Sequence, residues 1–189
     1  MIDKRAAAEA IGAFLRALGH EPAGELARTP ELVAAAWADD LLDGYSADPS
    51  EILREGSTDA GRGDHGPVVV RELSVTTVCP HHLMPAHGTA TVAYVPNRRL
   101  AGFGTIARLV DAYAHRLALQ EHVGESIVRA LRHELEPHAA LCILTLTHGC
   151  LVGRGERKAG AVIETMAVEG EYRYRQELLT SIRAMARRA

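Results

Sequence analysis

Apolar residues recur at helical spacing near the start of the chain. Over residues 3–18 they repeat every three or four positions, which predicts an amphipathic helix. A second helix is predicted to begin with Thr29 as its cap and Pro30 in its first turn, and to continue to Gly44. We therefore expect a helical hairpin over residues 1–45.

The middle of the chain alternates between β-branched runs and helical patterns. The runs predict strands at 68–78, 88–95, 140–147 and 161–168, and the patterns predict helices at 106–117 and 123–135, with a final amphipathic helix near the end. This strand-strand-helix-helix-strand-strand order predicts an α+β domain over residues 67–189, with an antiparallel sheet and helices on one face.

A polar segment rich in glycine, aspartate and serine joins these two parts. Residues 46–66 carry no sustained apolar period, which predicts a connecting loop with one short turn of helix after Pro49. A four-stranded sheet leaves open strand edges, and such edges are commonly covered by pairing between subunits. We therefore expect a homo-oligomer.

Composition excludes several classes of partner. A formal net charge of −3 gives no general attraction to nucleic acid or to an anionic membrane. No apolar stretch is long enough to cross a bilayer, and the start of the chain lacks a signal-peptide pattern. Three cysteines cannot all pair with one another, so thiols are expected to serve a metal, chemistry or packing in the cytoplasm.

Candidate metal ligands directly follow two of the predicted strands. Cys79 and His82 have a C-x-x-H spacing after one strand, and Cys150 follows another. Zinc binds thiolate and imidazole readily, and a catalytic zinc keeps three protein ligands and one open position. The spacing alone also fits buried cysteines with surface histidines. The second cluster favours a catalytic zinc site formed by Cys79, His82 and Cys150.

Two further histidines flank these ligands. His81 precedes His82, and His148 precedes Cys150 by two residues. An imidazole near neutral pH both accepts and donates protons, which predicts proton transfer by His81 and His148. The alternative is that they orient the metal ligands. Cys142 lies inside a strand among apolar residues and is expected in the core.

The sequence around these residues resembles the GTP cyclohydrolase I family over about residues 25–183. The matching motifs, in chain order, are Arg28-Thr29-Pro30, Cys79-Pro80-His81-His82-Leu83-Met84-Pro85, Gly88, Tyr94-Val95-Pro96, Gly102, Arg108, Arg116, Gln120-Glu121, His148-Gly149-Cys150 and Arg154-Gly155. Any one of these motifs is weak, but their colinear combination is specific.

The resemblance implies a tunnelling fold, with pentameric rings stacked into a decamer and active sites at subunit interfaces. It also implies that Cys79, His82 and Cys150 bind zinc, which activates water to attack C8 of a guanine-type purine. The imidazole ring then opens and loses formate. His81 and His148 would protonate the ring nitrogen and the ribose oxygen.

The resemblance further implies substrate binding at Gln120 and Glu121. Glu121 matches a carboxylate that accepts hydrogen bonds from the guanine ring N–H and exocyclic amine, and such a site rejects adenine. Without the resemblance, the same pair would be interpreted as an exposed helix start, where glutamate favours the helix dipole.

The phosphate end of the site departs from the family pattern. The family's serine and phosphate-binding lysine are Gly104 and Thr105 here, whereas Arg108 and Arg154 match. A triphosphate carries about four negative charges and needs several cations or amide donors. These two losses weaken the expected grip on a triphosphate, while the zinc and base-binding residues are intact.

Three hypotheses remain open from the sequence. The first is a GTP cyclohydrolase I that forms 7,8-dihydroneopterin triphosphate and formate with a variant phosphate site. The second is a relative that opens a purine base, nucleoside or 8-oxo purine and stops after ring opening. The third is a non-catalytic, zinc-stabilised oligomeric binding protein. A nitrile reductase of the same fold is disfavoured, because the ligand cysteines and histidine favour zinc.

Overall fold

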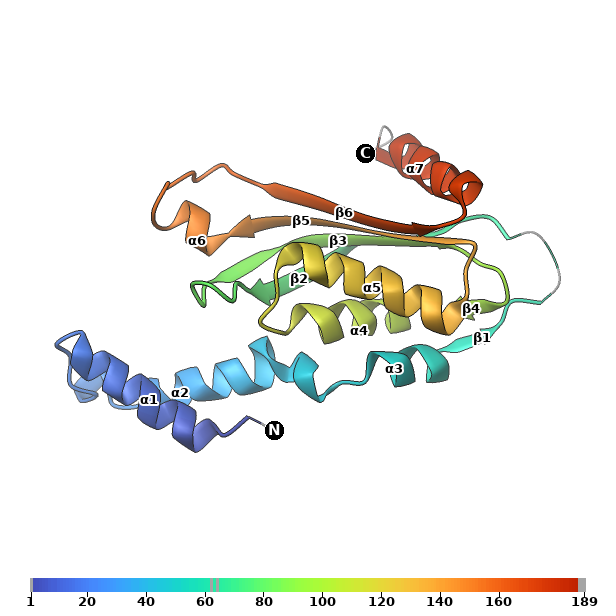
Figure 1. The fold of residues 1–189 in the computed structure, drawn as a ribbon. Helices are drawn as coiled ribbons and strands as arrows, with labels where there is room; N and C mark the ends of the chain where they lie inside the picture. The colour runs from blue at the N-terminus through green and yellow to red at the C-terminus, as the bar shows by residue number, and fades with distance from the viewer. Residues whose placement is uncertain (1, 62, 64, 187–189) are drawn as a thin grey trace.

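The computed structural model of the chain describes residues 2–61, 63 and 65–186 (Figure 1). Residue 1 and residues 187–189, which the predicted ranges 1–45 and 67–189 include, lie outside the described residues. Residues 62 and 64, within the predicted connector, also lie outside them.

A four-stranded antiparallel sheet forms the centre of the fold, in the order β2-β3-β5-β6. The strands are β2 (Val68–Val78), β3 (Pro85–Val95), β5 (Ala139–His148) and β6 (Ile163–Gly170). Each overlaps its predicted β-branched run, and β2 has its predicted bounds. Val78 pairs with Pro85 and Ala86 pairs with His148. The end of β2, the start of β3 and the end of β5 therefore meet at one end of the sheet.

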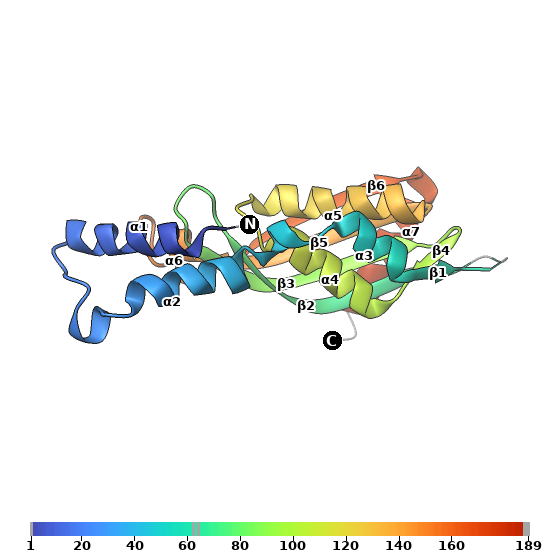
Figure 2. The same cartoon turned by 90° about the horizontal axis from the view of Figure 1, so that it is seen from below.

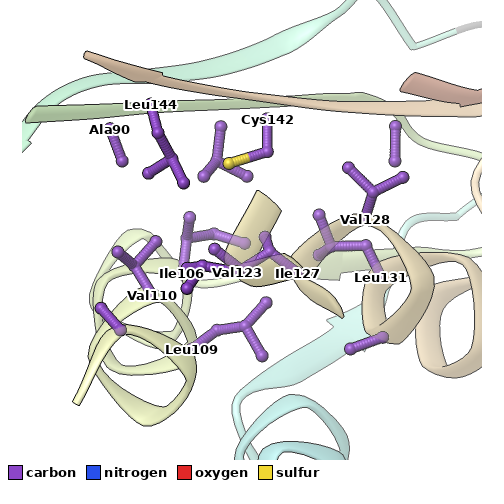
Figure 3. Packing of buried hydrophobic residues seen from close by; sticks show 14 of the residues in the cluster. Ala90, Ile106, Leu109, Val110, Val123, Ile127, Val128, Leu131, Cys142 and Leu144 are labelled. Carbon is purple, nitrogen blue, oxygen red and sulfur yellow. The ribbon is translucent and has the colours of Figure 1, made fainter. Parts of the chain in front are cut away.

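Two helices connect β3 to β5 and cover one face of the sheet, as Figure 1 shows. They are α4 (Phe103–Ala114) and α5 (Gln120–Leu135). Their apolar sides pack against inward-pointing strand residues, including Ile106, Leu109, Val110, Val123, Ile127, Val128 and Leu131 against Ala90, Cys142 and Leu144 (Figure 3). The predicted α+β order and the predicted core position of Cys142 are both confirmed.

The last helix, α7 (Tyr172–Ala186), lies on the opposite face of the sheet (Figure 1). Leu178 is fully buried there against Val95 and Leu141. The expectation that the helices lie on one face is therefore wrong for α7. Near Val95 and Ala139, strands β3 and β5 carry apolar residues on both faces of the sheet. The second face must therefore also be buried, and α7 buries it.

Helices α1 (Lys4–Ala17) and α2 (Thr29–Ala36) lie antiparallel beside each other, away from the sheet (Figure 2). Helix α2 is shorter than predicted, because a π-helical turn from Trp37 to Leu41 and a 3₁₀ turn from Asp43 to Ser46 follow it. Among the described residues, no helix combines the length and apolar character needed to cross a bilayer.

The two N-terminal helices differ in how they begin. The carboxylate of Asp3 caps α1 by accepting a hydrogen bond from the backbone N–H of Ala6 at 3.0 Å. The predicted cap at Thr29 is wrong, because Arg28 occupies the cap position without a side-chain hydrogen bond. Thr29 has already entered the first helical turn, with Pro30 following it.

The polar connector contains more regular structure than the sequence predicted. The short helix predicted after Pro49 is confirmed as α3 (Pro49–Glu55), which Asp48 caps. The strand β1 (Ser57–Asp59), which pairs with β4 (Arg99–Ala101), was not predicted. A three-residue strand is too short for its alternation to be recognised, and its partner lies far away in sequence. The β1–β4 pair ties the connector to the end of β3.

A close contact between β3 and β5 makes Gly88 a test of this sheet. A Cβ at Gly88 would lie 2.0 Å from the carbonyl oxygen of Thr145, so Gly88→Ala should lower the free energy of unfolding by at least about 2 kcal/mol. Urea unfolding followed by circular dichroism measures this change.

Gly104→Ala is the matched control, because nothing among the described residues lies within 4 Å of a Cβ built on Gly104 in α4. This variant should be unchanged or more stable by up to about 1 kcal/mol, since alanine favours helix. Equal stability of the two variants would contradict the close contact at Gly88.

Candidate metal centre and active-site cavity

A tight turn between β2 and β3 carries the first two candidate metal ligands. The backbone N–H of Leu83 donates to the carbonyl of Cys79 at 2.9 Å, and the N–H of Cys79 donates to the carbonyl of Met84 at 3.0 Å. Leu83 has a φ of 52°, a left-handed conformation that reverses the chain. These hydrogen bonds hold Cys79 and His82 on the same turn.

The third candidate ligand, Cys150, lies on the short helix α6 (Gly149–Val152) directly after β5. The pairing of Ala86 with His148 brings this helix beside the β2–β3 turn. Gly149 permits the approach, since a Cβ at this position would lie only 2.9 Å from the carbonyl oxygen of Pro85.

The structure brings Cys79, His82 and Cys150 together, with one ligand atom from each lying within 4.8 Å of the others. The sulfur of Cys79 is 3.8 Å from Nδ1 of His82. A tetrahedral zinc would hold a sulfur and a nitrogen ligand about 3.6 Å apart, which is close to this distance. Two thiols and one imidazole therefore fit a metal ion such as zinc, with one side open.

The surroundings of Cys150 raise the affinity of its thiol for protons. Burial raises the pKa of Cys150, and the thiol of Cys79 beside it raises it further, whereas the charge of Arg154 opposes both. A bound cation favours the thiolates of such a pair. Burial also raises the pKa of Cys142 to about 12, and this thiol lies in the core, away from the cavity.

A cavity of about 290 Å³ adjoins the three ligands. Its wall comprises Thr77, Cys79, Pro80, His81, His82, Ala118, Leu119, Gln120, Glu121, His148, Cys150, Leu151 and Ile163. A parallel bridge between Val78 and Leu117 holds the α4–α5 link beside the end of β2. The start of α5 therefore faces the metal ligands across the cavity.

Arg116 also holds the α4–α5 link in place, through hydrogen bonds to main-chain carbonyls. Its Nε donates to the carbonyls of Ala112 at 2.7 Å and Gly44 at 3.2 Å, and its guanidinium lies over the ring of Tyr45. The hydroxyl of Tyr45 accepts a hydrogen bond from the N–H of Leu117 at 3.2 Å. The N-terminal segment thus supports one wall of the cavity.

His148 is held by Gln120, which is 3% exposed. The amide nitrogen of Gln120 donates to the carbonyls of Leu144 at 2.9 Å and Ile163 at 3.1 Å, so its oxygen faces His148. Nε2 of His148 lies 2.7 Å from that oxygen and must therefore donate its hydrogen to it. A neutral His148 then has its unprotonated nitrogen at Nδ1.

The pKa of His148 is lowered by burial, although the carboxylate of Glu121 partly opposes this effect. Burial therefore favours the neutral ring. His81 and Glu121 also line the cavity, both on its exposed side. The ring centres of His81 and His82 are 6.2 Å apart in an edge-to-face arrangement.

Comparison with known proteins identifies the family. A family model described as GTP cyclohydrolase I matches residues 7–187. The chain belongs to the GTP cyclohydrolase I family. The GTP cyclohydrolase 1 of a Synechococcus strain is 37% identical over 179 residues, covering 92% of this chain and 77% of the relative. The GTP cyclohydrolase 1 of Ralstonia nicotianae is 36% identical over 172 residues, covering 90% of this chain and 81% of the relative.

Membership of the GTP cyclohydrolase I family and the observed order of strands and helices confirm the predicted tunnelling fold. Among solved structures, the apo crystal structure of the archaeosine synthase QueF-Like matches with a TM-score of 0.47 and 17% identity. The match covers 58% of this chain and 98% of that chain.

Two residues that resemble family phosphate contacts do not line the described cavity. Arg108 is exposed on α4, and Arg154 is exposed after α6. Thr105, at the position of the family's lysine, is buried and donates its hydroxyl to the carbonyl of Gly56 at 3.1 Å. The structure therefore brings together the predicted metal and base-binding residues but leaves the predicted phosphate contacts outside.

Sequence reasoning missed several residues of the cavity wall. Thr77, Leu151 and Ile163 line it, although no motif marks them. One feature of the sequence could have pointed to Thr77, because it is a polar residue two positions before the candidate ligand Cys79. Leu151 and Ile163 are ordinary apolar residues, and only the folded chain places them at the cavity.

Proposed function

We propose that this chain is a zinc-dependent cyclohydrolase that opens the imidazole ring of GTP and releases formate. The observation that carries the proposal is the Cys79-His82-Cys150 group beside a cavity that His148 and Glu121 also line. Relatives at 35–37% identity named GTP cyclohydrolase 1 support the same activity.

Zinc is the proposed metal because two thiols and an imidazole suit it better than magnesium or calcium, which prefer oxygen ligands. When bound, zinc supplies Lewis-acid activation of water near neutral pH. The thiols of Cys79, Cys142 and Cys150 are free, which supports the proposed cytoplasmic location, where thiols stay reduced.

We assign proton transfer to His148 and His81. His148 would act through Nδ1, because its Nε2 is bonded to Gln120. All hydrogen atoms of the Gln120 amide are directed to main-chain carbonyls, so we propose that Gln120 acts on the substrate through His148. Glu121 is proposed to accept hydrogen bonds from the ring N–H and amino group of guanine.

A homo-oligomer is part of the proposal. Strands β2 and β6 are the outer strands of the described sheet, and open strand edges favour pairing with other chains. The family resemblance supports a decamer of two pentamers. Arg108 and Arg154 could then approach a phosphate chain held across a subunit boundary, since both are exposed.

A second candidate substrate follows from one observation at the phosphate end. Thr105 uses its hydroxyl within the fold, so it offers neither a charge nor a free donor for phosphate. This arrangement favours a purine with fewer phosphates as the alternative substrate. The reaction could then stop after ring opening.

The zinc-loaded protein should be tested against GTP, GMP, guanosine, guanine and 8-oxoguanine, with formate and pterin fluorescence measured separately. Formate and pterin from GTP are the expected result. Formate from a base or nucleoside but not from GTP would show that the alternative compound, and not GTP, is the substrate. Opening of 8-oxoguanine would release carbon dioxide instead of formate, because its C8 already carries an oxygen. Binding with no formate, no carbon dioxide and no loss of purine absorbance from any of these compounds would indicate a non-catalytic protein.

A further inference from the structure

Three polar side chains are buried among the described residues, and one of them has no partner. The three are Thr77, Thr105 and Gln120, with exposed fractions of 2%, 4% and 3%. Thr105 donates to Gly56, and both ends of the Gln120 amide are bonded. The hydroxyl of Thr77 has no hydrogen-bond partner within the described part of the chain.

Thr77 lies on β2 where that strand approaches the metal ligands. It pairs with Ala86 on β3, and strand alternation places it on the same face as Val75 and Cys79. Val75 belongs to the apolar core beneath α4 and α5, whereas Thr77 lines the cavity. The residue therefore stands where the core ends and the cavity begins.

The fold alone gives no reason for a hydroxyl at this position. A buried hydroxyl without a partner destabilises the folded state, and valine has nearly the same shape. Apolar side chains, among them Leu119 and Ile163, form much of the surrounding wall. A hydroxyl in such a wall is satisfied only when the cavity holds a molecule with a hydrogen-bonding atom.

We propose that Thr77 is a specificity-determining residue that hydrogen-bonds the polar edge of the purine base in this cavity. The inference rests on the proposed function. Gln120 has no free hydrogen to offer, so the Thr77 hydroxyl supplies the buried contact while Glu121 binds from the exposed side. The hydroxyl both donates and accepts, which suits a guanine edge carrying a carbonyl, ring nitrogens and an amine.

Thr77→Val removes the hydroxyl and keeps the shape. Without ligand, the zinc-loaded variant should melt about 2–4 °C above the wild type, because a buried polar group without a partner is lost. For formate release from GTP, its KM should rise about tenfold while kcat changes little. Thr77→Ser, which keeps the hydroxyl, should retain a KM near that of the wild type.

Thr105→Val is the matched control for the melting experiment. Its hydroxyl is bonded to the carbonyl of Gly56, so this variant should melt below the wild type. A Thr77→Val protein that also melts below the wild type, or that keeps the wild-type KM, would overturn the inference. Inosine triphosphate lacks the exocyclic amine of guanine. If Thr77→Val raises the KM for this nucleotide too, Thr77 donates to the carbonyl or a ring nitrogen; if it does not, Thr77 accepts from the amine.

Failure of the proposed function is distinguishable from failure of this inference. If the wild type releases no formate from GTP, the function fails, and the melting shift produced by GTP and by guanine is compared between wild type and Thr77→Val. A smaller shift in the variant supports Thr77 as a base-binding residue. Equal shifts, including no shift in either protein, overturn it.

Discussion

Cys150→Ala is expected to abolish metal binding and to lower formate release by about a thousandfold or more. Cys150 supplies one of two thiols in the group that also contains Cys79 and His82. Removing it leaves two ligands, whereas a catalytic zinc site needs three. Loss of several kcal/mol of Lewis-acid stabilisation corresponds to a rate loss of roughly this size. Metal content by atomic spectroscopy and formate release measure the two effects.

Cys142→Ala is the matched control. Cys142 lies on β5, as His148 does, but its side chain points into the core between the sheet and α4 and α5 (Figure 3). This variant should keep one metal ion per chain and near wild-type turnover, while losing about 1 kcal/mol of stability. A Cys150→Ala protein with full metal content would contradict the proposed ligand set.

The second large effect is expected for His148→Ala. Its kcat should fall about 10²–10⁴-fold, which is typical for loss of a general acid or base, while the metal content stays unchanged. Gln120→Leu should lower kcat in the same direction but less, since it removes only the group that holds His148. Steady-state kinetics of formate release and metal analysis distinguish proton transfer from ligand loss.

His133→Ala provides the comparison for this experiment. His133 lies in the last turn of α5, far along the helix from Gln120, and its side chain is 82% exposed. This variant should keep wild-type kcat and KM. If His148→Ala kept the wild-type kcat, the proton-transfer role of His148 would be excluded.

Much of the fold could be predicted because its elements carry strong local patterns. The β-branched run of β2 and the one-sided apolar pattern of α5 each fix an element within a few residues. The β1–β4 pair could not be predicted, since two three-residue strands carry no measurable period. The position of α7 depends on which sheet face is left uncovered, which is a property of the assembled sheet.

The candidate site divides in the same way. Cys79 and His82 lie on one turn, so their proximity follows from local spacing, and Cys150 follows once β3 and β5 are paired. The bond between Gln120 and His148 could not be predicted, because 28 positions separate them and only packing orients the amide. Thr77 was missed for a related reason, since its lack of a partner is visible only when every neighbour is placed.

The hydrogen bonds of Gln120 have a consequence for how this site varies in evolution. The two acceptors that orient the amide, on Leu144 and Ile163, are main-chain carbonyls. Side-chain substitution at either position leaves these oxygens in place as long as the strands stay paired. The protonation pattern of His148 therefore depends on the side chain of Gln120 and not on which side chains stand at positions 144 and 163.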